Sequence, residues 1–261
     1  MYYEPIVPQA RPPSIQIDVI ESESPYARID EQPVRVPFLE QVEAIKVPMP
    51  SASCLLGDKL AAFAPSTIGY PYEPISRGGR ETEPRPIKVL KHLFDLGVLA
   101  ELGDNMTDAI ASYERIFAEQ LKFRADIFQR RGIAMTPELA LDDSQDAAFW
   151  AARVGGRRLA GNEKKLIFMQ NGIRALRSHL FTEPFAPAQT RLAAGRATLL
   201  AEIVRKGATD FDLPGALKAP LNVEYINGTQ LEDPWVDLNT IKGTNTDAYV
   251  LWEQAQRLQQ Q

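Results

Sequence analysis

Residues 86–101 have the sequence PIKVLKHLFDLGVLAE, and they mark a change in the character of the chain. Fourteen of the 20 prolines lie at or before Pro86, and proline interrupts helices because it removes a backbone donor and fixes φ. After Pro86 the apolar residues Leu90 and Phe94 recur at helical spacing, which predicts a helix over residues 87–101. The sequence therefore favours short strands and loops before this point and helices after it.

Further helices are predicted downstream by apolar periodicity, capping residues and glycine stop signals. They cover residues 107–131, 137–154, about 162–180, 188–206 and 247–258. Thr136 and Pro137 are a strong start signal, because threonine caps the first turn and proline suits the first helical position. The stretch 211–243 is rich in turn residues and has no assignable pattern.

Strands are predicted in the proline-rich part of the chain. Residues 14–20, SIQIDVI, alternate and are rich in β-branched side chains, while residues 33–38 and 44–47 are weaker candidates. Together with the helices that follow, these strands predict an α+β fold: a small β-rich N-terminal part and then a mainly helical part.

One helix is expected within the proline-rich part. Ser51 or Ser53 can cap a helix that continues to Phe63. The proline- and glycine-containing residues 65–86 then predict a loop of more than twenty residues, a length that is usually functional or disordered.

The composition is that of an ordinary globular chain. With 261 residues, of which 44% are hydrophobic and 24% charged, the chain can bury a sizeable core. Its apolar runs are far shorter than the ~20 residues of a membrane helix. A single cysteine excludes an internal disulfide, and the presence of only two histidines argues against a multi-histidine metal site. We expect a cytoplasmic protein with no membrane partner.

The net charge of −5 does not indicate nucleic-acid binding by bulk charge. Residues 136–206 nevertheless carry 11 basic and 7 acidic side chains, a local excess of +4. Seven of the basic residues share the interval from Arg153 to Arg177: Arg153, Arg157, Arg158, Lys164, Lys165, Arg174 and Arg177. They can form a groove for RNA or triphosphates, and a solvated helix surface explains them equally well.

Two candidate functional residues come from the first 60 positions. Asp18 lies on the polar face of the 14–20 strand, opposite Ile15, Ile17 and Val19, and faces solvent, a partner layer or a site. Lys59 shares a predicted helix face with Leu55 and Phe63. Its ammonium either reaches out to water along an apolar surface or points into a pocket, where it would suit a phosphate.

Asp95 is the third candidate, within the apolar part of the 87–101 helix. Lys91 precedes it by four residues, so an intrahelical ion pair is one explanation and a catalytic carboxylate is the other. The sequence leaves both open.

Three segments together resemble the AbiEii/AbiGii toxin family of nucleotidyltransferases, in the DNA polymerase β superfamily. They are the strand around Asp18, the helix segment LGDKLAA at 56–62, and KVLKHLFDL at 88–96. The resemblance covers about residues 10–105. It implies a partial nucleotidyltransferase-like α/β domain over residues 1–105 and a helical domain over residues 106–261.

The resemblance also implies roles for these residues. Asp18 would be the third carboxylate of a metal triad that holds Mg²⁺, Lys59 would contact the phosphates of an NTP, and Asp95 would be a second acid near the same site. Lys91 would take the place of the basic nucleotide-binding residue of the family. His92 stands where many members have an acid, and Asp58 replaces the usual Glu before the lysine. The implied partners are an NTP, an RNA or protein acceptor and a cognate antitoxin.

The sequence departs from the family in one respect. A Gly-Ser turn followed by an Asp-x-Asp pair is expected upstream of Asp18, and residues 1–17 contain neither. We therefore expect a truncated chain, a misassigned start or a degenerate homologue without activity.

Two other functions remain open at this stage. One is a non-catalytic interaction module whose β-rich part is completed by a partner chain. The other is an RNA-binding helical protein that uses the basic stretch from Arg153 to Arg177.

Overall fold

The computed structural model describes residues 23–34, 45–77, 80–132, 134–156, 163–180, 185–220 and 222–261. The strands in these ranges are short and form two antiparallel hairpins. Their bounds are β1 (Ile29–Pro33), β2 (Lys46–Pro50), β3 (Ile75–Arg77) and β4 (Arg80–Thr82). β1 pairs with β2 and β3 pairs with β4. The small N-terminal sheet followed by mostly helical structure confirms the α+β class.

Helices make up most of the described chain. They are α1 (Ala52–Ala62), α2 (Pro86–Leu99), α3 (Met106–Arg131), α4 (Pro137–Ala152), α5 (Glu163–Arg177), α6 (Pro187–Lys206), α7 (Leu213–Lys218), α8 (Val223–Gly228), the 3-10 helix η1 (Val236–Ile241) and α9 (Thr246–Gln260). The predictions for the helices that became α1 to α6 and α9 are confirmed to within a few residues.

Other predictions need correction. The first hairpin consists of strands 29–33 and 46–50. The strand predicted over 44–47 overlaps the second of these at residues 46–47, and most of the strand predicted over 33–38 lies outside the described residues. The loop predicted over 65–86 contains the β3–β4 hairpin. The unassigned stretch 211–243 holds α7, α8 and η1. The strand predicted over residues 14–20, and with it Asp18, lies outside the described residues.

Local signals explain where the main helices begin and end. The Ser51 hydroxyl accepts a hydrogen bond from the Cys54 amide and caps α1, and the Thr136 hydroxyl caps α4 through the Leu139 amide. Gly207 ends α6 with φ of 59°, a left-handed conformation that glycine adopts without strain.

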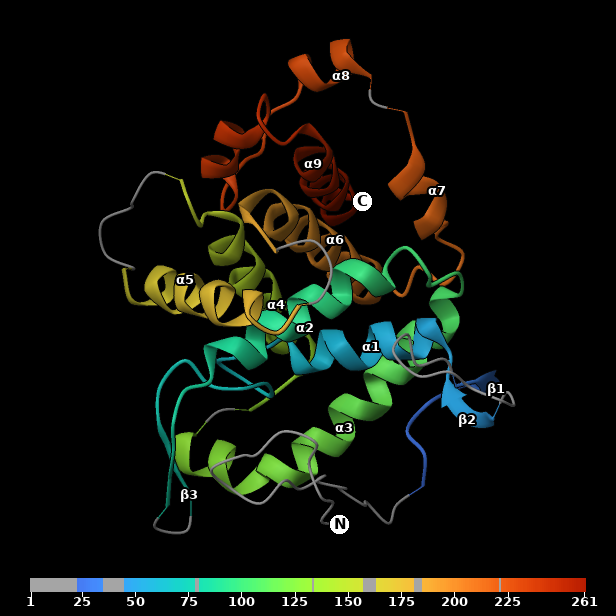
Figure 1. The fold of residues 1–261 in the computed structure, drawn as a ribbon, viewed down its shortest axis with the longest axis vertical. Coiled ribbons are helices and arrows are strands. Elements are labelled where there is room, and N and C mark those ends of the chain that lie inside the picture. Colours follow the sequence, from blue (N-terminus) through green and yellow to red (C-terminus); the bar gives the residue numbers. More distant parts are fainter. Residues whose placement is uncertain are drawn as a thin grey trace, which may run out of the picture.

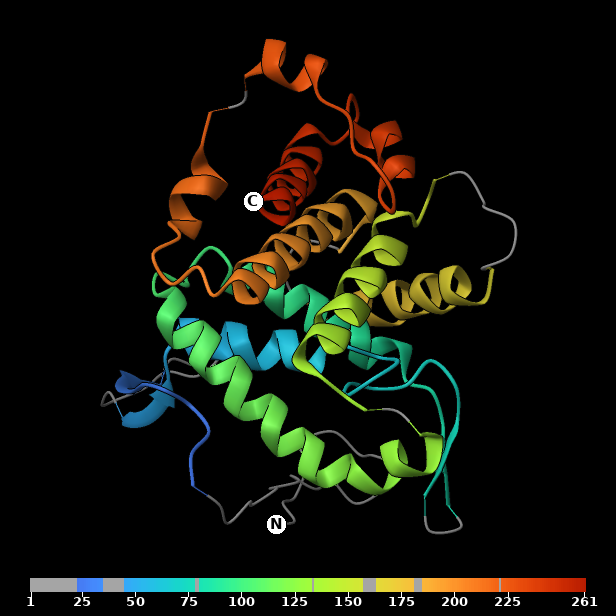
Figure 2. The same cartoon turned by 180° about the vertical axis from the view of Figure 1, so that it is seen from behind.

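Helix α1 occupies the middle of the molecule, packed against α2 and α3 (Figure 1). The view from behind shows α3 running obliquely to α1, with α6 and α9 on the other side of α1 and α7 and α8 at the outer edge (Figure 2). The backbones of α1 and α3 come very close at Gly57. A Cβ added there would overlap the carbonyl oxygen of Ala109 and lie 2.7 Å from the amide nitrogen of Tyr113.

The hydrophobic core is continuous. One cluster of buried apolar side chains extends from Leu56 in α1 to Ala255 in α9. It includes residues on both sides of position 105, where the domain boundary was predicted. That boundary stays a prediction. Among the described residues, no helix is both long and apolar enough to span a membrane.

Candidate functional site

Lys59 lies in the last turn of α1, between the fully buried Leu56 and Leu60. Its ammonium pairs with the carboxylate of the preceding Asp58 at 2.8 Å, and the two side chains are 23% and 20% exposed. The cap at Ser51 and the buried Leu56 and Leu60 fix the rotation of the helix, which determines the side on which Lys59 emerges. The ammonium is therefore held at a partly buried point on a rigid element.

Helix α2 contributes a row of polar side chains at helical spacing. Lys88, Lys91, His92 and Asp95 follow one another at i, i+3, i+4 and i+7, so they share one face. Lys91 pairs with Asp95 at 2.7 Å, as the ion-pair alternative required. We refer to Asp58, Lys59, Lys88, Lys91, His92 and Asp95 together as the α1–α2 site.

The two helices bring these groups within electrostatic reach of one another. Burial lowers the pKa of Lys59, but the hydrogen bond with Asp58 and the charges of Asp58 and Asp95 outweigh burial, and the pKa is raised overall. Lys59 is therefore charged at neutral pH. Because the charge of Asp95 acts on Lys59, two of the three predicted site residues lie in one neighbourhood.

His92 is the unusual member of the α1–α2 site. Burial, followed by the charges of Lys59 and Lys91, lowers its pKa to about 4. Both ring nitrogens are buried without a hydrogen-bond partner among the described residues. The ring stacks on that of Tyr70, with centroids 6.0 Å apart and an interplanar angle of 18°. His92 is therefore a neutral, oriented imidazole among cations.

The low pKa of His92 makes folding stability depend on pH. A free histidine protonates near pH 6.5, whereas His92 in the folded chain resists protonation down to about pH 4. Between pH 6.5 and pH 4 the unfolded state thus binds more protons than the folded state. The contribution of His92 to the free energy of unfolding is therefore highest above pH 6.5 and falls as the pH is lowered through this range. We expect a loss of about 2 kcal/mol between pH 7 and pH 5.

Urea unfolding of the unmodified chain and of His92→Gln at both pH values measures this contribution. The variant should lose about 2 kcal/mol less than the unmodified chain, and equal losses would contradict the assignment. The variant is needed as the reference because burial raises the pKa of Asp143 to about 6. That carboxyl stabilises the fold as the pH falls and would partly mask the effect of His92.

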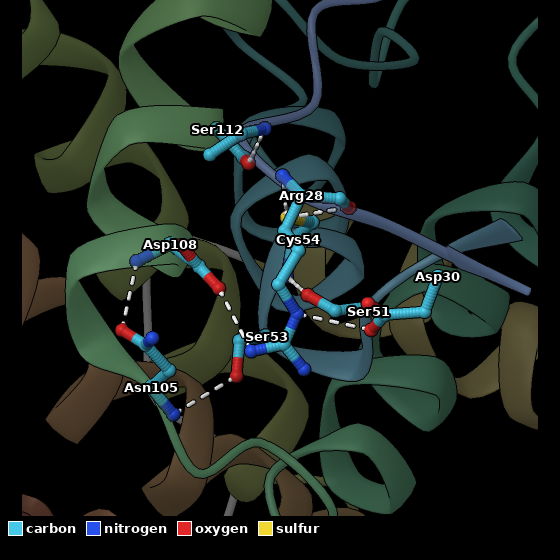
Figure 3. Close-up of polar contacts among 9 residues, drawn as sticks. Arg28, Asp30, Ser51, Ser53, Cys54, Asn105, Asp108 and Ser112 are labelled. Atoms are coloured by element: carbon cyan, nitrogen blue, oxygen red, sulfur yellow. Dashed lines mark hydrogen bonds and ion pairs between the residues drawn. The ribbon is translucent and has the colours of Figure 1, made fainter.

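The segment before β1 is anchored to α1 and α3 next to this site (Figure 3). The amide of Arg28 donates to the Cys54 thiol, and that thiol donates to the Arg28 carbonyl, at 3.2 and 3.4 Å. The Ala27 amide donates to the Ser112 hydroxyl at 3.2 Å, and Arg28 pairs with Asp108 at 3.4 Å. The Cys54 thiol therefore serves to hold the segment before β1 against α1.

Tyr26 lies beside the α1–α2 site as a result of this anchoring. Burial raises the pKa of its phenol, with a further contribution from the charge of Asp58. The carbonyl of Tyr26 accepts a hydrogen bond from Arg115 of α3 at 3.4 Å. Tyr26 therefore flanks the neighbourhood that holds Lys59.

Sequence reasoning missed Tyr26, Tyr70 and Lys88 as neighbours of the predicted residues. Lys88 could have been found, because it precedes Lys91 by three positions and His92 by four on a predicted helix. The two tyrosines come from irregular segments, and no spacing rule connects them to α1 or α2.

The described residues do not supply a metal site. No group of three or more His, Cys, Asp or Glu side chains among them could hold a metal ion. In the α1–α2 site, Asp58 and Asp95 are each paired with a lysine. An Asp-x-Asp pair does occur at Asp210 and Asp212, beside a hollow of about 410 Å³, but Asp212 caps α7 by accepting from the Gly215 amide.

The basic stretch from Arg153 to Arg177 is less uniform than its sequence suggested. Arg153 is buried and pairs with Asp237 at 2.6 Å, and Lys165 pairs with Asp146 at 2.6 Å. Lys164, Arg174 and Arg177 are exposed on α5 or at its end. Two of the seven cations thus stabilise the fold, and Arg157 and Arg158 lie outside the described residues.

An α+β scaffold that gathers lysines and carboxylates between two helices is suited to phosphorylated ligands, for which lysine is a good point charge. The chain matches the family model described as nucleotidyl transferase AbiEii toxin, type IV TA system, over residues 2–165. That match includes the whole α1–α2 site and more than half of the chain, and the chain belongs to this family. No curated protein and no solved structure matches the chain.

Proposed function

We propose that this chain is a nucleotidyltransferase that moves a nucleotide from an NTP onto a hydroxyl group of an RNA or protein acceptor. The observation that carries the proposal is the position of Lys59. Its ammonium is charged, partly buried, held by Asp58, and close to Asp95 and His92, all within the segment that matches the family. Such a fixed charge is suited to the phosphates of a nucleotide.

In the proposed reaction the acceptor oxygen forms a bond to the α-phosphorus of the NTP, and the bond from that phosphorus to the β-phosphate oxygen breaks. Pyrophosphate leaves with the electron pair of the broken bond, and the acceptor hydroxyl releases its proton to water. Lys59 binds the phosphates and offsets the charge that grows on the leaving group. Lys91 supplies a second cation, while Asp95 keeps that cation in place through their ion pair.

Mg²⁺ and Asp18 belong to the proposal through the family resemblance alone. The described residues do not fit a metal group, so no step is derived through the ion. When bound, Mg²⁺ would neutralise phosphate charge. Asp18 is proposed as one of its ligands.

A cognate antitoxin is the proposed protein partner, and the cytoplasm, where NTPs are plentiful, is the proposed compartment. The support for the antitoxin is the description of the matched family as a type IV toxin–antitoxin system.

Binding of each of the four NTPs tests the proposal, measured by calorimetry with Mg²⁺ and again with a chelator. Lys59→Met should weaken the binding of the preferred NTP by about tenfold to 100-fold, because it removes one charged hydrogen-bond donor to phosphate. The matched control is Lys122→Met on α3, since Lys122 is also paired with a carboxylate but is 71% exposed. It should bind as the unmodified chain does.

The opposite result has a clear meaning. If no NTP binds at millimolar concentration, the chain is not a nucleotidyltransferase, and the non-catalytic interaction module becomes the better hypothesis. If Lys59→Met and Lys122→Met bind equally well, Lys59 has no role in the nucleotide site.

A further inference from the structure

The imidazole ring of His92 makes no hydrogen bond within the described part of the chain. Both of its ring nitrogens are buried, and neither has a partner among the described residues. Most buried polar atoms in folded proteins do have a partner, so such an atom at a candidate site calls for an explanation. Tyr70 stacks on the ring at 18° and restricts its orientation. The donor is thus not used within the fold, and because both nitrogens are buried, a ligand reaches them only when the imidazole or the stacked Tyr70 ring moves.

The charges around His92 indicate what the partner would be. The ammonium groups of Lys59, Lys91 and Lys88 lower the pKa of the ring and the charge of Asp58 raises it, while Asp95 is a second carboxylate on the same face of α2. Lys59 and Lys91 already have carboxylate partners. Among the residues that the structure describes, no ion pair involves Lys88. The surroundings therefore favour an anion, and Lys88 is a cation whose charge is available to it.

We propose that His92 is a phosphate-binding residue of the nucleotide site, donating a ring N–H to a non-bridging oxygen of the triphosphate beside Lys59 and Lys88. This inference rests on the proposed function and adds a residue to it. A neutral imidazole suits the position because it donates a hydrogen bond without adding a fourth positive charge to the three lysines.

Inorganic tripolyphosphate is the direct probe, because it carries the phosphate chain without a base or sugar. We compare its affinity for the unmodified chain, for His92→Phe and for His179→Phe by calorimetry. Phenylalanine keeps a flat ring against Tyr70 and removes both nitrogens. His179 is exposed at the end of α5 and serves as the matched control. His92→Phe should bind at least about tenfold more weakly, as for loss of a hydrogen bond to a charged group, and the control should be unchanged.

A second measurement needs no variant of His92. The chain has two histidines, so the ring signals in a ¹⁵N NMR spectrum are assigned by recording His179→Phe. On titration with tripolyphosphate the His92 ring signals should shift, and those of His179 should stay. This result stands even if His92→Phe fails to fold.

The outcomes separate this inference from the proposed function. Unchanged affinity in a folded His92→Phe, or unmoved His92 signals at saturation, overturns the role of His92, while a loss in Lys59→Met would still support the nucleotide site. If the unmodified chain binds neither tripolyphosphate nor any NTP, both proposals fall. Binding that depends on His92 and not on Lys59 would keep the phosphate role and remove the role proposed for Lys59.

Discussion

Gly57→Ala is expected to destabilise the fold by about 3 kcal/mol or more, a large part of the stability of a typical domain. The added methyl group would meet backbone atoms of α3, the Ala109 carbonyl oxygen and the Tyr113 amide nitrogen. A backbone cannot rotate away as a side chain can, so α1 and α3 would have to separate. Chemical denaturation followed by circular dichroism measures the loss.

The control for this prediction is Gly228→Ala, at the end of α8. A Cβ at Gly228 would meet no atom within 4 Å. That variant should change stability by less than about 1 kcal/mol, because alanine mainly restricts the unfolded chain. If Gly57→Ala proved as mild as this control, the close approach of α1 and α3 would be wrong.

Arg205→Met is the second change with a large expected effect, about 3–5 kcal/mol of lost stability. Glu202 on α6 has a side chain with no exposed surface, and Arg205 one turn later lies 3.3 Å from its carboxylate. Gln145 of α4 donates to the same carboxylate at 2.7 Å. Without Arg205, a buried negative charge would keep only a neutral partner.

A double variant identifies the cause of that loss. Glu202→Gln combined with Arg205→Met removes the buried charge together with its partner, so it should be more stable than Arg205→Met alone, although it carries two changes. The exposed pair of Lys122 and Glu119 provides the reference, because Lys122→Met should cost less than about 1 kcal/mol. A double variant that is less stable than the single one would refute the charge explanation.

The helices were predictable where a local signal coincides with a long apolar pattern. Ser51 and Thr136 cap α1 and α4 as their residue types suggest, and proline marks the start of α2. α7 and α8 were missed because they have six residues each and depend on tertiary contacts. The hydroxyl of Tyr225 in α8, for example, donates to the buried Glu253 of α9.

The strand boundaries show a different limitation. The β1 sequence IDEQP and the β2 sequence KVPMP have weak strand character, and each contains proline. Their register pairs Ile29 with Pro50 and Pro33 with Lys46. Register follows from where the two segments meet in space, which a single strand's composition does not encode.

The candidate site was predictable within one helix and not between helices. The spacing of Lys91 and Asp95 allowed an intrahelical ion pair as one of two alternatives, and the structure has that pair at 2.7 Å. The approach of Lys59 to Asp95 depends on how α1 and α2 pack, which the spacing along either helix does not specify. The catalytic roles of Lys59, Asp95 and Asp18 stay predictions.

The central position of α1 determines in which order the segments of the protein should unfold. Ser53, Cys54, Leu56, Gly57, Leu60 and Ala61 of this helix are all buried. Its amides should exchange with deuterium only through global opening, whereas α8, with its exposed residues 224 and 225, should exchange through local fluctuations. Among the described segments, a protease would then cut around α8 before it cut α1, and Lys59 would keep its place after α8 had opened.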